Sequence, residues 1–585
     1  MRPTTIFALL FSVLILAATP PAHSLQSRLA AQNALLQSQF QDDLRLSPET
    51  ATAYGDYRYN SLLDRRSLAA SAEQNASDRS FQTKLEAIST DGFPEQDRIS
   101  HDLLLHLLQQ RITNFDLKIH EMPLTQMQGV HNDIADLPHS VPLGSVKQYE
   151  DYIARLRQVP LAFNETIEVL QQGEKDGLMP PKLLLEQIPS QCEGTIDENP
   201  FLEPAKNFPS SFSTADQKRL NAELAQVVNE DVLPAYHRFA EFVASDYAPS
   251  GRDSLGLSAL PDGLKRYQNA IREQTTTNLS PADIHALGLR EVARITGLMT
   301  DLAHQEGFSD PKSYGAALRA NPKYKPQSAE QIVEDFRRYI LQMQSRLPDL
   351  FNLLPKTPIT VEAIPPSQPG NATHYIGGTT DGSRPGRVVV ATSDFAQRVL
   401  FGDETLAYHE GVPGHHRQVS VQQQLTGLPD FRLHLNNNAY AEGWAVYAEA
   451  LGKEVGLFQD HASDFGRLSI ELVRAVRLVI DPGIHAQGWS RNQAVAYFRE
   501  SGSADEPTIQ AEVDRYIAWP AQALGYKIGQ LKILELRERA KQQLGPHFDI
   551  RHFNDEILNA GSLPLDMLEQ HVDRWISSQR KSAAA

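Results

Sequence analysis

One stretch organises the chain: Thr405-Leu406-Ala407-Tyr408-His409-Glu410-Gly411-Val412-Pro413-Gly414-His415-His416. Its apolar first half predicts a helix that ends in a His-Glu pair. Pro413 and Gly414 then deform the helix, because proline lacks a backbone donor and glycine relaxes φ. On a regular helix, the six-residue step from His409 to His415 would turn their side chains about 240° apart. We therefore expect a kink that returns His415 to the face of His409.

The His-Glu pair matches the start of the zincin motif H-E-x-x-H, in which two histidines bind zinc and the glutamate is the general base. With a two-residue insertion, the metal ligands would be His409 and His415. Glu410 would then take a proton from a metal-activated water molecule. His416 is the alternative ligand, but a regular helix would place it about 10 Å further along the axis than His409. That distance favours His415 and leaves His416 to bind substrate or to orient a ligand.

A third ligand is predicted in the helical stretch 438–449. Glu442 lies there within an apolar run, where a charged side chain needs a partner. Zinc would be that partner, and a His/His/Glu site leaves one coordination position open for water. Glu449 follows on the same helical face and would either orient a ligand histidine or stay solvated. The expected cofactor is one zinc ion per chain.

The motif H-E-x-x-P-G-H-H and the later Glu442-Gly443-Trp444-Ala445 resemble those of a bacterial family catalogued as domain of unknown function 885. That family is similar to the gluzincin metallopeptidases. Further matching blocks are Asp381–Gly386, Asp481–Ser490, Arg515-Tyr516 and Pro520–Gly529. The resemblance covers most of the chain after its first residues and is specific from about Asn371 to Gly529. It implies a zinc-dependent peptidase.

The matching blocks also contain candidates for contacts with the substrate. Related peptidases place a tyrosine or a histidine beside the developing oxyanion, so the resemblance implies that role for Tyr526 and His485. Arg384, Arg515 and Gln522 are candidates for holding a substrate carboxylate or backbone, and arginine can bind a carboxylate with two hydrogen bonds. The alternatives are a surface salt bridge for each arginine and a packed aromatic ring for Tyr526.

Apolar spacing predicts helices over most of residues 25–355 and again after Asp394. Two β-branched stretches between them, Ile359–Ile364 and Arg387–Thr392, predict strands. We expect a mainly α, gluzincin-like fold with two helical halves around a deep cleft and a small β-sheet next to the metal-binding helix. One catalytic unit would span residues 25–577. Its helical N-terminal half would be 25–355 and its catalytic half 356–577, with a frayed tail at 578–585.

The first residues predict export. Met1-Arg2-Pro3 is followed by an apolar run over Thr5–Thr19 and by small residues at Ala22-His23-Ser24, which is typical of a signal peptide cleaved after Ser24. The apolar run is shorter than the roughly 20 residues that span a membrane, so we expect no membrane anchor after cleavage. The mature protein would be periplasmic or extracellular.

Charge and composition exclude some functions. The formal net charge of -17 argues against a nucleic-acid partner, which would need a basic face. A single cysteine excludes an intrachain disulfide. The predicted function is an exported zinc peptidase that acts on peptides and uses Glu410 as its base. The alternatives are a zinc hydrolase of another amide or ester, and a non-catalytic peptide-binding protein, for which no general base would be needed. The oligomeric state is not predicted.

Overall fold

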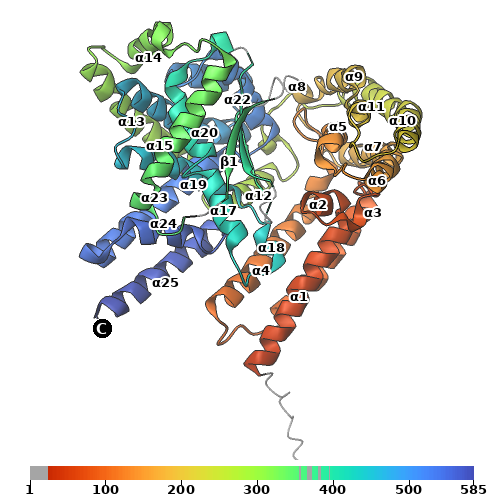
Figure 1. Cartoon of the computed structure of the whole chain (residues 1–585), viewed down its shortest axis with the longest axis horizontal. Coiled ribbons are helices and arrows are strands. Elements are labelled where there is room, and N and C mark those ends of the chain that lie inside the picture. Colours follow the sequence, from red (N-terminus) through yellow and green to blue (C-terminus); the bar gives the residue numbers. More distant parts are fainter. Residues whose placement is uncertain (1–23, 355–356, 365–371, 380–383, 394, 585) are drawn as a thin grey trace, which may run out of the picture.

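The computed structural model describes residues 24–354, 357–364, 372–379, 384–393 and 395–584. Two lobes of unequal size are connected by long helices (Figure 1). The helices of the smaller lobe are α5 (Val130–Ser140), α6 (Val146–Leu156), α7 (Val159–Lys175), α8 (Lys182–Leu185), α9 (Ile188–Glu198), α10 (Thr214–Val227) and α11 (Leu233–Phe242). This lobe has a hydrophobic core of its own, which includes the buried Cys192.

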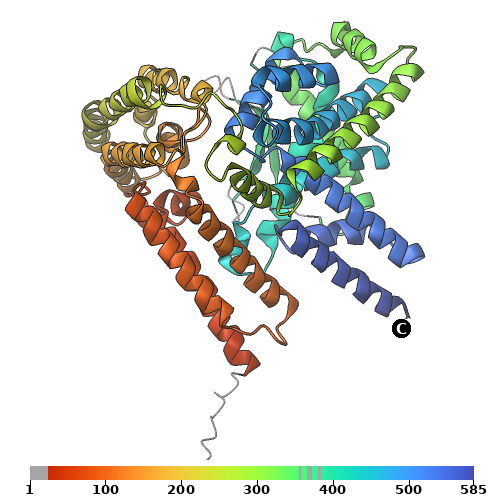
Figure 2. The same ribbon diagram turned by 180° about the vertical axis from the view of Figure 1, so that it is seen from behind.

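The N-terminal helices extend from the smaller lobe along the larger one (Figures 1 and 2). They are α1 (Leu25–Leu46), α2 (Pro48–Ala53), α3 (Leu68–Glu86) and α4 (Glu95–Asp116). Helix α1 begins directly after the predicted cleavage site, while the rest of the predicted signal peptide lies outside the described residues. Among the described residues, no helix is long and apolar enough to cross a membrane.

The larger lobe contains the remaining helices. They are α12 (Gly263–Thr275), α13 (Pro281–Gln305), α14 (Pro311–Ala320), α15 (Ala329–Leu350), α16 (Asp403–Glu410), α17 (His415–Gln424), α18 (Asp430–Leu433), α19 (Asn438–Glu454), α20 (His461–His485), α21 (Arg491–Ser501), α22 (Glu506–Ala518), α23 (Leu524–Leu544), α24 (Ile550–Leu558) and α25 (Leu565–Ala584). Its main core also includes residues of α1 and α4, so it draws on both of the predicted halves. The division of the chain at residue 355 stays a prediction.

The sheet has three strands in the order β1-β3-β2. The strands β1 (Ile359–Ala363) and β3 (Gly386–Val390) coincide with the two predicted ones and pair in parallel. The strand β2 (His374–Ile376) pairs antiparallel to β3 and forms one edge of the sheet. The prediction of a mainly α fold with a small sheet next to the metal-binding helix is confirmed, although β2 was not predicted.

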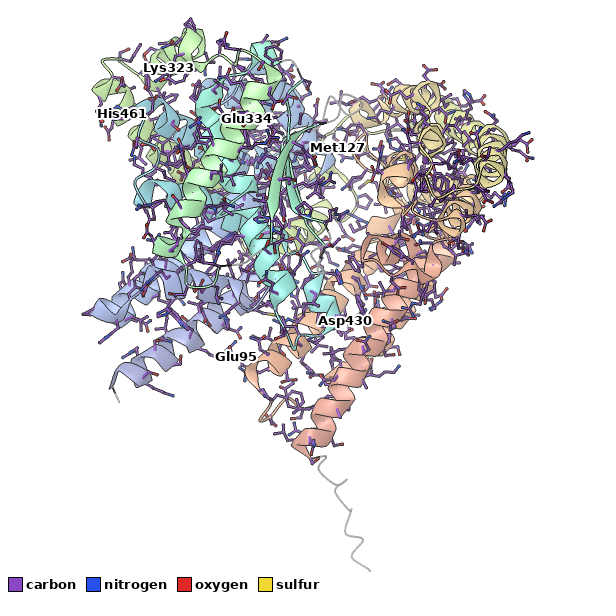
Figure 3. The ribbon with its side chains drawn as sticks, viewed as in Figure 1. Glu95, Met127, Lys323, Glu334, Asp430 and His461 are labelled. Carbon is purple, nitrogen blue, oxygen red and sulfur yellow. The ribbon has the colours of Figure 1, made fainter. Side chains whose placement is uncertain are left out.

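The long helices are fastened to the larger lobe by polar contacts at its lower end. Figure 3 labels Glu95, the first residue of α4, and Asp430, the first residue of α18, at this junction. The carboxylate of Glu95 lies 3.1 Å from His571 and 2.8 Å from Arg574, both on α25. The buried Arg432 of α18 donates hydrogen bonds to α4 and to the segment before α25. The start of α4 and the C-terminal helix α25 therefore meet here.

Helices α19 and α23 cross in close backbone contact. A Cβ added to Gly443 of α19 would lie 2.4 Å from Cα of Gly529 on α23, and a Cβ added to Gly529 would lie 1.8 Å from the carbonyl oxygen of Ala439. Only glycine permits this approach. The crossing places Glu442, next to Gly443, and Tyr526, one turn before Gly529, in the wall of the same cavity.

Buried charges join three helices behind that cavity. The ammonium of Lys527 on α23 is fully buried and lies 2.7 Å from Glu471 on α20 and 3.0 Å from Glu291 on α13. Arg294 of α13 also lies 2.6 Å from Glu471. Buried charges of this kind are tolerated because each has a partner of opposite sign.

Candidate metal centre

The kink between α16 and α17 has the geometry that the sequence predicts. Helix α16 ends at Glu410, and α17 begins at His415. A Cβ added to Gly414 would lie only 1.9 Å from the carbonyl oxygen of His409, so the chain doubles back closely enough to require glycine. The indole of Trp444 on α19 donates a hydrogen bond of 3.0 Å to the carbonyl oxygen of Pro413 and holds the kink against the next helix.

The kink brings together three side chains that could hold a metal ion. Ligand atoms of His409, His415 and Glu442 all lie within 4.8 Å of one another. Oε2 of Glu442 lies 3.4 Å from Nε2 of His409 and 3.5 Å from Nε2 of His415. Donors around a tetrahedral zinc ion with bonds of about 2.0–2.2 Å are on the order of 3.4 Å apart. The spacing therefore fits a divalent metal of zinc size.

The electrostatics of the three residues also fit a cation. Oε2 of Glu442 is buried and has no hydrogen-bond partner. Burial opposes the ionisation of Glu442, but the two imidazoles hold its pKa well below its usual range. Burial likewise opposes protonation of His409, yet the carboxylates of Glu442 and Glu449 raise its pKa to about 10. The cluster thus contains a buried carboxylate oxygen without a hydrogen-bond partner, and its electrostatic environment favours a positive charge. Both properties match the donor set of a metal site.

Glu449 orients one of the candidate ligands from behind. Its Oε1 lies 2.8 Å from Nδ1 of His409, and both side chains are buried. Because the carboxylate accepts the proton on Nδ1, the tautomer leaves Nε2 free to bind a metal. On His415, Nδ1 lies 3.4 Å from Oε1 of Gln418, one turn further along α17.

Glu410 has the environment of a general base. One of its carboxylate oxygens lies 4.0 Å from Nε2 of His409, so it is beside the metal-binding atoms without being one of them. Burial raises the pKa of Glu410 above its usual value, and the nearby His409 and His415 oppose this rise. A raised pKa suits a carboxylate that must accept a proton and later release it.

These residues lie in a cavity of about 1020 Å³. Its walls come from α16, α17, α19, α20, α22 and α23 and from the edge strand β2. Tyr375 of β2 lines the cavity, and its hydroxyl lies 3.1 Å from Nδ1 of His416. The other ring nitrogen of His416 lies 3.2 Å from the carbonyl oxygen of Thr357. His416 is therefore buried behind the cavity wall, where it holds Tyr375 rather than the metal or the substrate.

Tyr526 and Arg515 line the cavity as predicted. The ring of Tyr526 is nearly parallel to that of His409, with ring centroids 6.4 Å apart. Arg515 donates a hydrogen bond of 3.3 Å to the hydroxyl of Tyr526 and another to the side chain of Gln522. Gln522 does not line the cavity. It lies behind Arg515 and bridges that residue to Asn438 of α19.

Two further predicted site residues lie away from the cavity lining. His485 is fully buried at the end of α20, where Nδ1 accepts the amide proton of Leu257 and Nε2 donates to the carbonyl oxygen of Tyr516. Both nitrogens are used, and burial lowers its pKa to about 4, so the predicted catalytic role of His485 is replaced by a structural one. Arg384 is exposed and donates to the carbonyl oxygen of Gly377. It does not line the cavity, which leaves its predicted contact with substrate without support.

Sequence reasoning assigned no role to another part of the cavity wall. Arg474 and Arg477 of α20 and Glu512 of α22 all line the cavity. The only signal for the two arginines was their spacing of three residues on one helix, which places them on the same face. Tyr375 was missed because its three-residue strand has too little pattern to be recognised.

Proteins of known structure have the same fold. A "putative lipoprotein" from Colwellia psychrerythraea is 29% identical and superposes with a TM-score of 0.88 over 94% of this chain and 99% of that chain. A "putative lipoprotein of unknown function" from Shewanella oneidensis is 18% identical and superposes with a TM-score of 0.72 over the same shares of the two chains. An M32 carboxypeptidase from Deinococcus radiodurans R1 is 10% identical and aligns over 95% of this chain and 99% of that chain, but its TM-score of 0.34 is too low to show a shared fold.

The sequence comparisons agree with the motif. The family described as "Bacterial protein of unknown function (DUF885)" matches residues 48–572, which confirms the predicted family. A search of curated proteins finds no match.

Proposed function

The chain belongs to the bacterial family DUF885, and from this premise we propose that it is an exported, zinc-dependent peptidase. One observation carries the proposal. The orphaned Oε2 of Glu442 lies 3.4 Å and 3.5 Å from the Nε2 atoms of His409 and His415, and the carboxylate of Glu410 is beside them in a large cavity. Two imidazoles, one carboxylate and an adjacent buried glutamate are the groups that metal-dependent hydrolysis requires.

The chain's own residues account for the proton transfers of peptide hydrolysis. Zinc held by His409, His415 and Glu442 would polarise the substrate carbonyl and lower the pKa of water. Glu410 takes one proton from the attacking water and gives it to the leaving nitrogen as the C–N bond breaks. One water molecule is consumed, and the products are a carboxylic acid and an amine, whose remaining proton exchange gives a carboxylate and an ammonium group at neutral pH.

Tyr526 is the group we assign to the oxyanion that develops on the carbonyl oxygen. Arg515 donates to the oxygen of the tyrosine hydroxyl, so the hydroxyl proton stays free to be donated elsewhere. Burial raises the pKa of Tyr526 above its usual value, which keeps this proton in place. A preorganised donor of this kind stabilises the transition state more than the ground state.

The edge strand β2 offers a way to hold the substrate backbone. Residues of β2 line the cavity, and the strand pairs with β3 on one side only among the described strands. An extended peptide that adds to such an edge is held by main-chain hydrogen bonds, which do not depend on its side chains. Tyr375, fixed by His416, would contact the peptide from the same strand.

Two observations favour export. The N-terminal pattern over residues 1–24 predicts a signal peptide, and α1 begins at Leu25. The two similar structures from Colwellia psychrerythraea and Shewanella oneidensis are each described as a "putative lipoprotein", which is consistent with an exported family. A periplasmic or extracellular peptidase fits both observations.

Metal content tests the ligand assignment. We expect elemental analysis of the purified mature protein to find about one zinc ion per chain, and close to none in Glu442→Ala. The control is Glu454→Ala, which removes a carboxylate of the same helix that pairs with Arg537 and does not line the cavity. It should retain zinc. A wild-type protein that stays metal-free after zinc is supplied would contradict the ligand assignment.

Hydrolysis of a peptide mixture, followed by mass spectrometry, tests the activity. Glu410→Gln should keep its zinc and its affinity for peptides but lose roughly 100-fold to 10,000-fold in kcat, the usual contribution of a general base. Turnover of simple esters or non-peptide amides, with no turnover of any peptide, would favour the alternative hydrolase. Peptide binding without turnover in the wild type would favour a peptide-binding protein.

A further inference from the structure

Three arginines form one wall of the cavity. They are Arg474 and Arg477 of α20 and Arg515 of α22. Their guanidinium carbons lie 5.1 Å, 4.4 Å and 5.8 Å, respectively, from the centre of the Tyr526 ring. The same ring stacks against His409, with centroids 6.4 Å apart. We call these three residues the arginine wall, and it adjoins the metal centre through a single aromatic side chain.

The arginine wall carries more positive charge than its neighbours balance. Glu512 lies 2.7 Å from Arg477 and 3.1 Å from Arg515. Burial opposes its ionisation, but these guanidinium groups hold the pKa of Glu512 at about 2, so it is fully ionised at neutral pH. Arg474 forms no hydrogen bond or ion pair with the residues that the structure describes. Among the described residues, Glu512 is thus the one carboxylate within ion-pair distance of these three guanidinium groups.

Two of the guanidinium groups also have unused donors. Arg477 is only 3% exposed, and its Nη1 has no hydrogen-bond partner. Nε of Arg474 is likewise buried without a partner. Buried charged donors without acceptors are unfavourable, and most such groups in proteins are satisfied. The terminal nitrogens of Arg474 also have no hydrogen-bond partner among the described residues, but they are not buried, and Arg474 lines the cavity. An anionic ligand oxygen in the cavity would reach them, and a guanidinium binds a carboxylate with strong, directed hydrogen bonds.

We propose that the arginine wall binds a carboxylate of the peptide substrate, located one or two residues beyond the scissile bond. The proposal rests on the peptidase function inferred above and specifies its substrate class. One residue of an extended peptide spans about 3.5 Å. The centre of the Tyr526 ring lies 4.4 Å from the guanidinium carbon of Arg477 and 6.4 Å from the centre of the His409 ring, so each separation corresponds to one or two residues. The carboxylate is either the free C-terminus, which makes the protein an exopeptidase, or an acidic side chain.

Four matched peptides separate these sources. They have one sequence in four forms: a free C-terminus, an amidated C-terminus, and an amidated C-terminus with either glutamate or glutamine near the end. We expect amidation to lower kcat/KM by about 100-fold, chiefly through KM, because charged hydrogen bonds to the arginine wall are lost. Recovery with glutamate but not with glutamine would identify an acidic side chain as the source. Equal cleavage of all four peptides would overturn the proposal.

Arg474 is the residue to change, because its replacement breaks no hydrogen bond or ion pair to a described residue. Arg474→Met should reduce the preference for a carboxylate to a few-fold without loss of zinc or of thermal stability, and Arg474→Lys should restore part of it. The control is Arg319→Met, which removes a positive charge of the same cavity from α14. It should keep the preference. A full preference in Arg474→Met would overturn the role of the arginine wall.

Binding separates this proposal from the peptidase function. Calorimetry on zinc-loaded Glu410→Gln measures the affinity for free-acid and amidated peptides without turnover. If Glu410→Gln binds the free-acid peptide more tightly than the amidated one, and the double variant with Arg474→Met does not, the role of the arginine wall is supported. This holds even if the wild type cleaves no peptide. Cleavage by the wild type with no such difference in affinity or in kcat/KM would refute the arginine wall and leave the peptidase function intact.

Discussion

Oε1 of Glu449 lies 2.8 Å from Nδ1 of His409, and both side chains are buried. Glu442, seven residues earlier on α19, lies 3.4 Å from the other ring nitrogen of the same histidine. One helix therefore supplies carboxylates to both nitrogens of a single imidazole. The first carboxylate sets the tautomer, and in our proposal the second would share the metal with the ring.

Changing Glu449 should weaken the metal site without removing a ligand. We expect Glu449→Gln to lower zinc affinity by roughly 10-fold and Glu449→Ala by up to about 100-fold, because the carboxylate makes His409 a better ligand. Competition with a chromogenic chelator measures this affinity. Glu454→Gln, near the end of the same helix, is the control. Unchanged affinity in both Glu449 variants would mean that the hydrogen bond does not orient His409.

Tyr526→Phe tests the oxyanion contact. The phenylalanine ring keeps the packing against His409 and the arginine wall, so zinc content and thermal stability should stay close to those of the wild type. We expect kcat to fall by roughly 100-fold to 1,000-fold, the usual effect of losing one oxyanion donor, with little change in KM. Steady-state kinetics with a peptide that the wild type cleaves measure kcat and KM for both proteins. An unchanged kcat would mean that Tyr526 only packs.

Gly529→Ala tests the close crossing of α19 and α23. The added methyl group would lie 1.8 Å from the carbonyl oxygen of Ala439, so the helices must move apart. We expect a loss of about 1–3 kcal/mol in the free energy of unfolding, together with weaker zinc binding, because Glu442 and Tyr526 belong to the two displaced helices.

The matched control for this substitution is Gly297→Ala on α13, where an added Cβ would meet no atom within 4 Å. It should be neutral or stabilise the protein by up to about 1 kcal/mol, since alanine favours a helix more than glycine does. Thermal unfolding of both variants gives the comparison. Equal melting temperatures for the two variants would contradict the steric argument.

The buried charges around Lys527 predict a dependence of stability on pH. Burial opposes the ionisation of Glu471, but Lys527 and Arg294 lower its pKa from the ordinary 4.5 to about 2. A lowered folded-state pKa stabilises the fold above pH 4.5, and this contribution, on the order of 3 kcal/mol, is lost as the pH falls towards 2. Denaturant unfolding should show that Glu471→Gln is less stable than the wild type at pH 7 and that the difference shrinks by pH 3.

The result that would contradict this prediction is a stability difference that stays constant between pH 7 and pH 3. It would mean that the carboxylate of Glu471 titrates alike in the folded and unfolded protein. Lys527→Met gives a second measurement, because it leaves Glu471 and Glu291 buried with less positive charge. Loss of a partner from such a group typically destabilises a protein by about 3–5 kcal/mol at neutral pH.

The core of the site could be predicted because its chemistry is local in the sequence. His409 and His415 are close in the chain, and the Pro-Gly insertion between them has a definite effect on helix geometry. Glu442 could be added because an acidic residue in an apolar helix needs a partner. The helical fold followed from the same apolar periodicity, and β1 and β3 from their β-branched residues.

The rest of the site depends on packing between distant elements, which periodicity does not describe. His485 belongs to a block that matches the family, yet contacts with Leu257 and Tyr516 occupy both of its nitrogens. Gln522 supports Arg515 from behind instead of facing the cavity. We assign a function to Arg474 because it has no hydrogen-bond or ion-pair partner among the described residues. Whether an arginine has such a partner depends on which side chains the fold places around it, and the sequence pattern does not reveal this.

The side chains of the adjacent residues His415 and His416 contact different parts of the site. One contributes to the metal centre, and the other holds Tyr375 of the edge strand. Neighbouring Cα atoms are about 3.8 Å apart across a trans peptide, so this pair ties the candidate metal centre to the position of one cavity wall. Substitutions that widen the cavity on the β2 side should therefore also disturb metal binding. Attempts to alter substrate preference should be directed at α20 and α22, which contribute none of the three candidate ligands.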